Sequence, residues 1–485
     1  MSLLYSPKDK YITDTFIYMA NNQYHAFSGV ASNGKWDWGA SGMAIGHAVS
    51  TDLIHWQECE NALEPTGGAN FDGIAVNVGC VIEHNYLYYM FYWTRCSKPN
   101  TPYIGLAVSD DLYKWKRVSD EPIIQADARW YETESLPDNH GGCCGCNLRD
   151  PFVFKCDEDD LFHMIFASRT TEGPLEGRGC IGHAVSENLI NWECLPPLLA
   201  PGYYGEMEVP QIFELNGRFY LQFHSNSSLW LSEKGRNELP YYDQIPAHFY
   251  WVSDKATGEY NRPDEHVLIG NAPDICNPLV VRVFDDLNGT PSVIHFNMAR
   301  FAKSDDGEHI PGPLSLPKSI TSLENGLLSC GVHPSVEKLK SNILLEKNDI
   351  KPNADYLLGI EVPDSFTSEF DFVLKRAGRT GFLLWCDQKM SELSGYELCL
   401  NKEVDAVELK RRRDSKVIAS RSLKVIPGGA SKLKIIVCDN IIDIYLNDCW
   451  VMTAPAYEDR GRYLSLFGTA YIEEIKSVKI RSFTL

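Results

Sequence analysis

The sequence lacks several features that would assign whole classes of function. None of its 485 residues lie in an apolar run approaching the roughly 18 residues that span a bilayer. Its first ten residues, MSLLYSPKDK, contain neither an apolar signal segment nor a small-residue cleavage site. No glycine-rich turn is followed by Gly-Lys-Ser/Thr, the pattern that cradles phosphates. These absences argue against a membrane-spanning protein, a secreted protein and a P-loop enzyme.

Basic residues are also in short supply. The 45 Lys and Arg are outnumbered by 65 Asp and Glu, which gives a formal net charge of −20. A surface this acidic repels the phosphates of nucleic acids and anionic lipids. We therefore expect no nucleic-acid partner and no membrane partner, and the sequence leaves the oligomeric state open.

The cysteines do not form an evenly spaced set. There are 15 of them, an odd number, and Cys143 is directly followed by Cys144. A secreted disulfide framework more often has an even number of cysteines at regular spacing. We expect reduced thiols and a cytoplasmic location.

A repeated unit is the clearest positive feature. The segments 45–56, 104–115 and 181–192 read IGHAVSTDLIHW, IGLAVSDDLYKW and IGHAVSENLINW. Each follows an aromatic segment and predicts a buried strand, a polar turn and a short return strand. One turn position is occupied in the three copies by Asp52, Asp111 and Asn188. A residue type that recurs in this way indicates hydrogen bonding to the local backbone.

Fainter copies follow, at 219–223 with 249–253 and around 293–296. Recurring four-stranded units predict an all-β fold that begins with a five-bladed β-propeller, and we assign it to residues 1–318. The proline-rich run before Lys318 predicts a break, so residues 319–339 are assigned to a linker. Alternating strand patterns over residues 340–485 predict a β-sandwich.

Acidic residues lie at similar places in three blades. Asp14, Asp150 and Glu208 precede the aromatic second strand of their blades by ten to twelve residues, and Asn77 has this place in the second blade. The first strands of propeller blades line one mouth of the central channel, so these side chains are expected to converge. Glycosidic bond hydrolysis uses such carboxylates as nucleophile or base, as acid and as sugar ligand. The alternative for each acid is a role in a turn or in solubility.

Three further features are candidate parts of the site. Arg149 is expected to keep Asp150 ionised and to orient it. Trp38 and Trp93 are candidate sugar-stacking residues, with packing inside a blade as the alternative. The segment 140–146, HGGCCGC, lacks the Cys-x2-Cys spacing of a zinc knuckle, so we interpret it as a glycine-rich loop at the pocket rim. We expect no metal and no cofactor.

The ordered motifs resemble glycoside hydrolase family 32, the invertase and fructanase family. The segment 46–56 resembles its first-blade signature WGHAVSxDLxHW, and 314–318 resembles its LSLPR segment. Arg149-Asp150-Pro151 matches its RDP motif, and Glu208-Val209-Pro210 resembles its ECP motif. The resemblance implies that Asp14 is the nucleophile, Asp150 the transition-state stabiliser and Glu208 the general acid/base.

The chain departs from the family in its nucleophile motif, where WMNDPNG is replaced by YITDTFI around Asp14. Ile45 replaces the Trp before Gly-His-Ala, and Val209 replaces the Cys after Glu208. The sequence predicts retaining hydrolysis of fructofuranosyl or related furanosyl linkages in short oligosaccharides. Two alternatives are an inverting pentosidase on a similar propeller and a catalytically degenerate carbohydrate-binding protein.

Overall fold

The structure is a computed structural model, and the regular secondary structure of its described part is almost entirely β-strand. It describes residues 3–32, 42–96, 102–133, 148–226, 231–270, 282–350, 356–375, 378–387, 394–423, 429–457 and 461–483. The helices there are α2 (Glu233–Glu238), α3 (Pro334–Leu339) and the short 3-10 turns η1 (Leu175–Gly177), η2 (Tyr241–Asp243), η3 (Phe301–Lys303) and η4 (Thr469–Tyr471). None of the described helices is long and apolar enough to cross a membrane. The predicted all-β class is confirmed.

Four-stranded antiparallel sheets make up the N-terminal part of the chain. In the first three, the strands are β1 (Lys10–Ala20), β2 (Gln23–Ser32), β3 (Ala44–Ser50), β4 (Gln57–Glu58); β5 (Ala75–His84), β6 (Leu87–Arg95), β7 (Pro102–Ser109), β8 (Lys116–Arg117); and β9 (Leu148–Lys155), β10 (Phe162–Arg169), β11 (Gly179–Ser186), β12 (Glu193–Leu199). The fourth contains β13 (Glu208–Leu215), β14 (Arg218–Asn226), β15 (Pro246–Ser253) and β16 (Val267–Gly270). In these four sheets the strands follow one another in chain order, as expected for the repeated unit.

The fifth sheet has the order β17-β18-β21-β22, with β17 (Arg282–Asp285), β18 (Pro291–Ile294), β21 (Lys318–Ser322) and β22 (Leu328–Val332). Between β18 and β21 the chain forms a separate two-stranded sheet of β19 (Phe296–Arg300) and β20 (His309–Leu314). Part of the predicted linker 319–339 is therefore strand in the fifth sheet. Two prolines of the run before Lys318, Pro311 and Pro313, lie inside β20, a strand of this two-stranded sheet, and the fifth sheet continues after them with β21 and β22.

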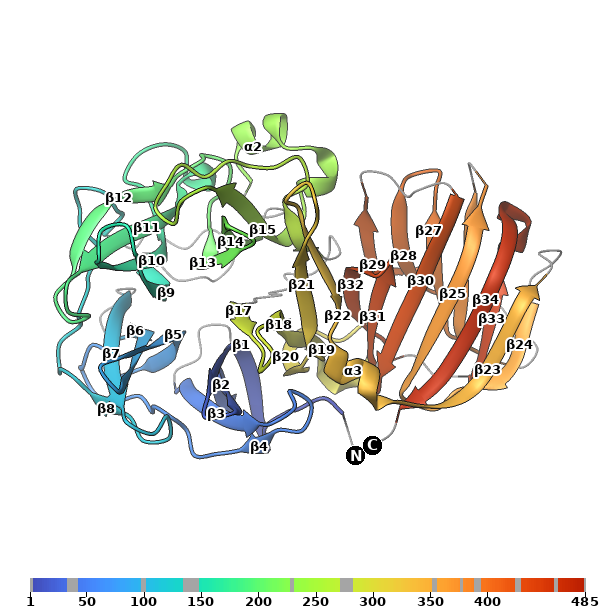
Figure 1. Cartoon of the computed structure of the whole chain (residues 1–485), viewed down its shortest axis with the longest axis horizontal. Helices are drawn as coiled ribbons and strands as arrows, with labels where there is room; N and C mark the ends of the chain where they lie inside the picture. Colours follow the sequence, from blue (N-terminus) through green and yellow to red (C-terminus); the bar gives the residue numbers. More distant parts are fainter. Residues whose placement is uncertain are drawn as a thin grey trace.

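The first strands of the five sheets face a common centre, and β4, β8 and β12 lie at the periphery (Figure 1). These first strands contact one another in succession, from β1 to β5, β9, β13 and β17, and β17 contacts β1. Each pair of successive sheets shares a cluster of buried apolar side chains. Apolar burial between sheets is thus the main stabilising contribution to this part of the molecule.

The repeated turns have one structure. The side-chain oxygen of Asp52 accepts hydrogen bonds from two backbone amides downstream, and the Asp111 and Asn188 oxygens do the same. The indole N–H of each closing Trp donates to the carbonyl of a leucine three residues earlier, and that leucine has a φ of 66° or 67°. The predicted structural role of these turn residues is confirmed.

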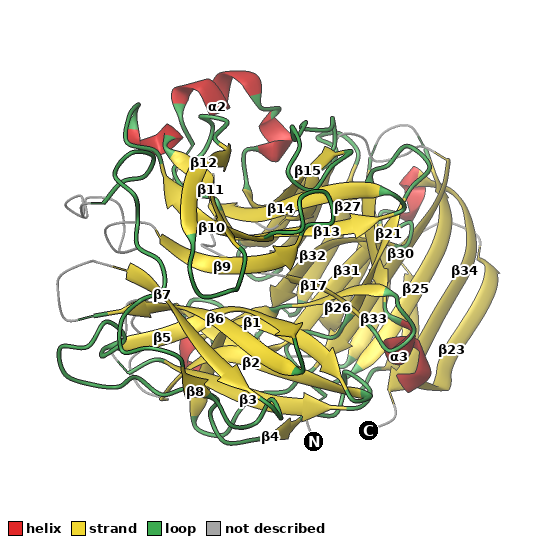
Figure 2. Cartoon of the chain, turned by 60° about the vertical axis from the view of Figure 1, so that its left-hand side comes forward, coloured by secondary structure: helices red, strands yellow, loops and turns green. Residues whose placement is uncertain are grey.

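The C-terminal part contains two six-stranded sheets. Their strands are β23 (Lys340–Ile350), β34 (Ile472–Phe483), β25 (Phe366–Leu374), β30 (Gly429–Cys438), β31 (Ile441–Leu446), β32 (Cys449–Pro455) in one, and β24 (Tyr356–Glu361), β33 (Tyr463–Phe467), β26 (Arg379–Cys386), β27 (Tyr396–Asn401), β28 (Ala406–Arg411), β29 (Val417–Ser422) in the other. Both sheets contribute to one apolar core. Figure 2 shows them beside the four-stranded sheets, and a mixed apolar cluster joins the two parts.

A buried ion pair lies at this junction. Lys318 Nζ is 3.1 Å from Asp443 Oδ2, and the Lys318 side chain is fully buried. The same ammonium lies 4.2 Å from the centre of the Trp450 ring. A charged contact between β21 and β31 thus supplements the apolar packing.

Candidate active site

A β-bulge interrupts the first strand of each of the first four sheets. Two residues oppose one residue of the second strand between Ile12 and Thr15, between Asn77 and Cys80, between Arg149 and Phe152, and between Glu208 and Gln211. A bulge bends a strand and turns a side chain out of the regular alternation. All four bulges lie at the predicted site residues, so the same irregularity positions each of them.

The carboxylates do not occupy equivalent positions at these bulges. Glu208 is the last paired residue before its bulge, Asp150 is the first bulged residue, and Asp14 is the second. Asn77 corresponds to Glu208 in this register. From Glu208 to Asp150 to Asp14, the position of the acid relative to the bulge thus advances by one residue each time.

Two bulge residues have an unusual backbone conformation. Asp150 has a φ of 58° and Val209 a φ of 48°, in the left-handed region that a β-branched residue such as valine rarely adopts. The Val209 backbone N–H donates to Oδ2 of Asp150 at 3.0 Å. Strained backbone of this kind is often associated with functional sites, and here it fixes the orientation of one acid against the neighbouring strand.

Arg149 connects the acids. Its Nε lies 3.5 Å from Oδ2 of Asp150, and its Nη2 lies 2.6 Å from Oε1 of Glu208. The same Nη2 also contacts Oε2 of Glu206 at 3.1 Å, and the Arg149 side chain is only 14% exposed. Charge-assisted bonds in such a dry setting hold the carboxylates in place.

The first and second sheets meet at Asp14. Asn77 donates from Nδ2 to Oδ2 of Asp14 at 3.3 Å, and the Asn77 side chain is buried. Thr13, where the family motif has an asparagine, is buried and donates to the carbonyl of Gly29. Asn77 therefore supplies an amide next to the predicted nucleophile.

Burial and like charge raise the pKa of Asp14 to about 7. Loss of solvation is the largest cause, the charges of Asp150 and Glu208 add to it, and the Arg149 and Arg282 guanidinium groups oppose it. Burial likewise raises the pKa of Asp150 above its ordinary value, although Arg149 opposes the shift. The cluster therefore resists full ionisation.

The surroundings shift the pKa values of Glu206 and Glu208 in opposite directions. Burial, together with the charge of Glu208, raises the pKa of Glu206 to about 7 against the effect of Arg149. Burial also acts to raise the pKa of Glu208, but Arg149 and a hydrogen bond with His224 outweigh it and hold that pKa below its ordinary value. The His224 Nδ1 lies 3.0 Å from Oε2 of Glu208.

The structure thus brings together Asp14, Asn77, Arg149, Asp150 and Glu208. Trp93 lies directly opposite Asn77 on β6, with its indole nitrogen buried and without a hydrogen-bond partner among the described residues. Trp38 and the cysteine-containing segment 140–146 lie outside the described residues. The roles predicted for all these residues remain predictions.

Three residues of the cluster are absent from the sequence-based prediction. Glu206 lies two residues before Glu208, and His224 is the cross-strand partner of Glu208 on β14. Arg282, fully buried on β17, donates to the backbone carbonyls of Asp150, Pro151 and Pro210. A pattern of two glutamates around Met207 could have indicated Glu206; no local signal indicates His224 or Arg282.

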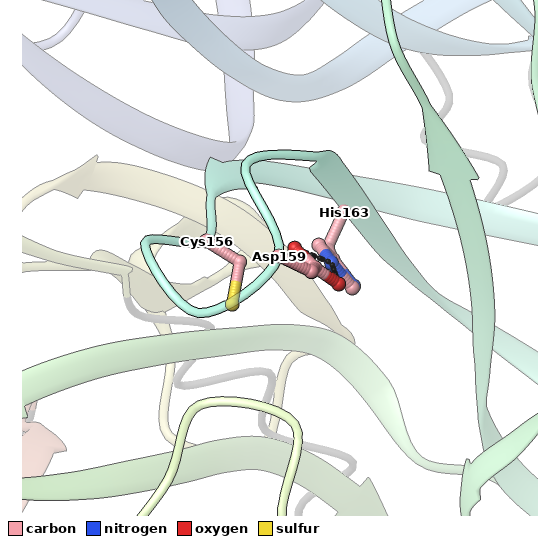
Figure 3. Close-up of side chains that lie close together, drawn as sticks. All are labelled: Cys156, Asp159 and His163. Atoms are coloured by element: carbon pink, nitrogen blue, oxygen red, sulfur yellow. Dashed lines mark hydrogen bonds and ion pairs between the residues drawn. The ribbon is translucent and has the colours of Figure 1, made fainter.

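A separate group of possible metal ligands lies in the loop between β9 and β10 and at the start of β10. One ligand atom each from Cys156, Asp159 and His163 lies within 4.8 Å of the others. Figure 3 shows the Asp159 carboxylate facing the His163 ring, which it contacts at 3.0 Å. A hydrogen bond with the Cys156 side chain is among the contacts that lower the pKa of Asp159. The other ring nitrogen of His163 lies 2.8 Å from Nε2 of His183. These hydrogen bonds account for the group without a metal.

Comparison with known proteins gives concordant results. The profile of the Glycosyl hydrolases family 32 N-terminal domain matches residues 5–271, more than half of the chain. The sucrose-6-phosphate hydrolase of Zymomonas mobilis subsp. mobilis is 22% identical over 477 residues, covering 94% of this chain and 85% of that protein.

Solved structures share the fold at low sequence identity. The sucrose-6-phosphate hydrolase from Lactobacillus gasseri superposes with a TM-score of 0.76 at 16% identity, covering 100% of this chain and 93% of the other. The fructan 1-exohydrolase IIa from Cichorium intybus superposes with a TM-score of 0.74 at 16% identity, covering 100% and 97%. The resemblance predicted from the motifs is confirmed: this chain belongs to glycosyl hydrolase family 32 and is a glycoside hydrolase.

Proposed function

We propose that this enzyme hydrolyses fructofuranosyl linkages in short oligosaccharides, with retention of configuration at the anomeric carbon. The family supports this proposal. So do the similar proteins, which are named as hydrolases of sucrose 6-phosphate and of fructan. The observation that carries the proposal is the proximity of three carboxyl groups at the bulges of the first, third and fourth sheets, with Arg149 contacting two of them.

Each carboxyl has its own role. Asp14 attacks the anomeric carbon while Glu208 transfers its proton to the leaving oxygen, which breaks the glycosidic bond and leaves a fructosyl ester on Asp14. Glu208, now a carboxylate, takes a proton from water, and the resulting attack releases fructose and restores Asp14. Asp150 accepts hydrogen bonds from ring hydroxyls and stabilises the positive charge of the transition state.

The remaining predicted residues hold the sugar and the acids. Arg149 orients Asp150 and Glu208, and Asn77 orients the Asp14 carboxylate and hydrogen-bonds a sugar hydroxyl. Trp93, on the face that carries Asn77, and Trp38 provide aromatic surfaces for stacking against the sugar. The small-molecule partner of this site is its oligosaccharide substrate. The proposal also places the enzyme in the cytoplasm.

The proposal includes a closed five-bladed β-propeller as the scaffold. Its support is the succession of contacts from β1 through β17 and back to β1. β21 and β22 complete the fifth blade, and the two six-stranded sheets pack as a β-sandwich around their shared core. Deletion of residues 340–485 should cause aggregation, because it exposes the apolar cluster between the two parts.

The test is release of sugar from a panel by the wild type and two variants. Sucrose, sucrose 6-phosphate, 1-kestose, inulin, levan, difructose anhydrides, and aryl arabinofuranosides and xylosides are incubated with the wild type, Asp14→Asn and Glu208→Gln. Fructose release should fall by about 10³-fold or more in both variants. Asp52→Asn is the matched control, because it makes the same change at a turn where Asn188 already does the same work.

When methanol replaces water as the acceptor of the sugar, NMR should show that the first product keeps the anomeric configuration of the substrate. Release of pentose, with inversion, would overturn the assignment in favour of a pentosidase. Binding of sugar without any release would instead assign the chain to the catalytically degenerate proteins.

A further inference from the structure

Glu206 is a buried carboxyl that the roles above leave unused. Its side chain is 5% exposed, and one oxygen contacts Nη2 of Arg169 at 2.8 Å. Its other oxygen contacts Nη2 of Arg149 at 3.1 Å, the same nitrogen that lies 2.6 Å from Oε1 of Glu208. Glu206 and Glu208 therefore share one guanidinium nitrogen.

We propose that Glu206 is a positioning residue that sets the protonation state of Glu208 by competing with it for Arg149. This inference rests on the acid/base role proposed for Glu208 and deepens it. When Glu206 is ionised, Arg149 and Arg169 both stabilise it, so Glu208 has a weaker hold on Arg149 and retains a proton. When Glu206 is protonated, Arg149 stabilises Glu208 as a carboxylate.

The proton exchange balances within the pair. The O–H bond of Glu206 breaks as an O–H bond forms on Glu208, and the total charge of the two groups stays at −1. Glu208 then gives this proton to the leaving oxygen, and the proton that it later takes from water restores the pair. No other reactant is needed.

The surrounding charges favour one proton on the pair. The charged and titratable groups that act on it come from the first strands and from the strands beside them: Asp14, Arg149, Asp150, Arg169 and His224. Glu132 and Arg178 lie one step further out, where Glu132 pairs with Arg169 and Arg178, and Arg282 contacts the Asp150 carbonyl. Because Asp14 and Asp150 are carboxyls, they oppose a second negative charge on the pair. The arginines prevent the pair from binding two protons.

The difference in pKa between the two glutamates supports this division. Burial raises the pKa of Glu206 to about 7, whereas Arg149 and His224 hold the pKa of Glu208 below its ordinary value against the effect of burial. The contacts of Arg149 agree with this order, since its Nη2 lies 2.6 Å from Glu208 and 3.1 Å from Glu206, and the proposal places the proton on Glu206 before substrate binds.

A purely structural role for Glu206 is the competing explanation. Arg169 donates from Nε to the carbonyl of Gly205 at 3.0 Å, so Glu206 could serve only to fix Arg169 against the strand that follows. Loss of Glu206 would then lower activity by the same factor at every pH. The pH profile separates the two explanations.

The experiment compares kcat/KM for sucrose against pH in the wild type, Glu206→Gln and Glu206→Asp. Glutamine cannot ionise, so Arg149 stays with Glu208, and Glu208 loses its proton at lower pH. The basic limb of the Glu206→Gln profile should move down by about one pH unit, which lowers activity above that limb about tenfold. Glu206→Asp keeps an ionisable group and should restore the limb toward its wild-type position.

Glu132→Gln is the matched control. Glu132 is also buried and pairs with Arg169 and Arg178 at 3.8 Å, so its replacement removes a carboxylate from the same arginine. The basic limb of the kcat/KM profile of Glu132→Gln should stay at the wild-type pH. An unmoved limb in Glu206→Gln, or an equal shift in Glu132→Gln, would overturn the proposal.

A second readout does not depend on turnover. With 13C-labelled glutamate, the infrared spectrum of the substrate-free wild type near pH 6 should contain a protonated carboxyl band that Glu206→Gln lacks. Absence of this difference also overturns the proposal. If no sugar is released by the wild type, the proposed function fails, while the infrared result still decides whether Glu206 holds the proton of the pair.

Discussion

Nδ2 of Asn77, on the second sheet, donates a hydrogen bond to Oδ2 of Asp14, on the first, at 3.3 Å. Gly29 makes this approach possible. A Cβ atom at Gly29 would overlap with Oδ1 of Asn77 and Oγ1 of Thr13. Because Gly29 has no side chain, the bulged strand β1 and the Asn77 amide can meet beside the Asp14 carboxyl.

Gly29→Ala should therefore reduce catalysis with little loss of folded protein. The methyl group displaces Asn77 or Thr13 and so turns the Asp14 carboxyl, and a misplacement of this size lowers kcat by about tenfold to a hundredfold. Steady-state kinetics and circular dichroism measure the two effects. Gly331→Ala is the control, since its Cβ would meet its nearest neighbour at 3.4 Å, an ordinary contact. Equal kinetics for the two variants would contradict the prediction.

Asp14→Asn should stabilise the protein more at pH 8 than at pH 5. The folded-state pKa of about 7 lies above the ordinary 3.8, so the folded chain holds a proton that the unfolded chain has released over this interval. The stability contributed by this proton is complete below about pH 4 and is lost as the pH rises through 7. Asparagine carries no such dependence, so its gain in unfolding free energy should reach on the order of 1 kcal/mol at pH 8.

Urea unfolding at the two pH values measures this gain. Asp52→Asn should show no gain at pH 8, because hydrogen bonds with His55 and Ile54 lower the pKa of Asp52 in spite of partial burial. A gain for Asp14→Asn that is the same at both pH values would show that its carboxyl is not perturbed.

His224→Leu should move the basic limb of the kcat/KM profile upward, opposite to Glu206→Gln. His224 contacts Oε2 of Glu208 at 3.0 Å and lowers the pKa of that group. Without it, Glu208 should keep its proton to a pH about half a unit higher or more. His224→Asn retains a hydrogen-bond donor near the position of Nδ1. The basic limb of its profile should therefore lie between those of the wild type and His224→Leu. A downward shift in His224→Leu would contradict this account of Glu208.

Asp443→Ala should strongly destabilise the junction between the two parts of the chain. It leaves the Lys318 ammonium buried with its acidic partner removed, and such losses cost about 3–5 kcal/mol. Thermal and denaturant unfolding measure the change. Asp306→Asn breaks ion pairs with Arg411 and Lys416 at a carboxylate that is 49% exposed, so it should have a much smaller effect. Similar losses in both variants would argue against a special role for the buried pair.

The repeats predicted much of the fold because their information is local. Each turn of the Asp52 type is fixed by bonds within a few residues, and the spacing to the next aromatic strand then places the first strand of the blade. The same spacing predicted where Asp14, Asp150 and Glu208 would lie. It did not predict their stagger, because a bulge adds a residue without leaving a clear sequence signal.

Other parts of the site depend on contacts between distant segments. Arg282 reaches the Asp150 carbonyl across more than 130 residues, and nothing around it in the sequence indicates that carbonyl as its partner. The positive φ of Val209 runs against the preference of valine, so only its surroundings explain it. The division of charge between Glu206 and Glu208 also follows from a shared arginine that strand pairing alone does not reveal.

The repeated turns make the outer hairpin of a blade structurally independent of the inner strand. Each outer hairpin is closed by its own side chain and tryptophan, so its shape needs nothing from the inner strand. The inner strand is thereby free to change its residues without loss of the blade. This independence explains how the chain can carry YITDTFI in place of the family motif WMNDPNG and still present Asp14 to the same centre.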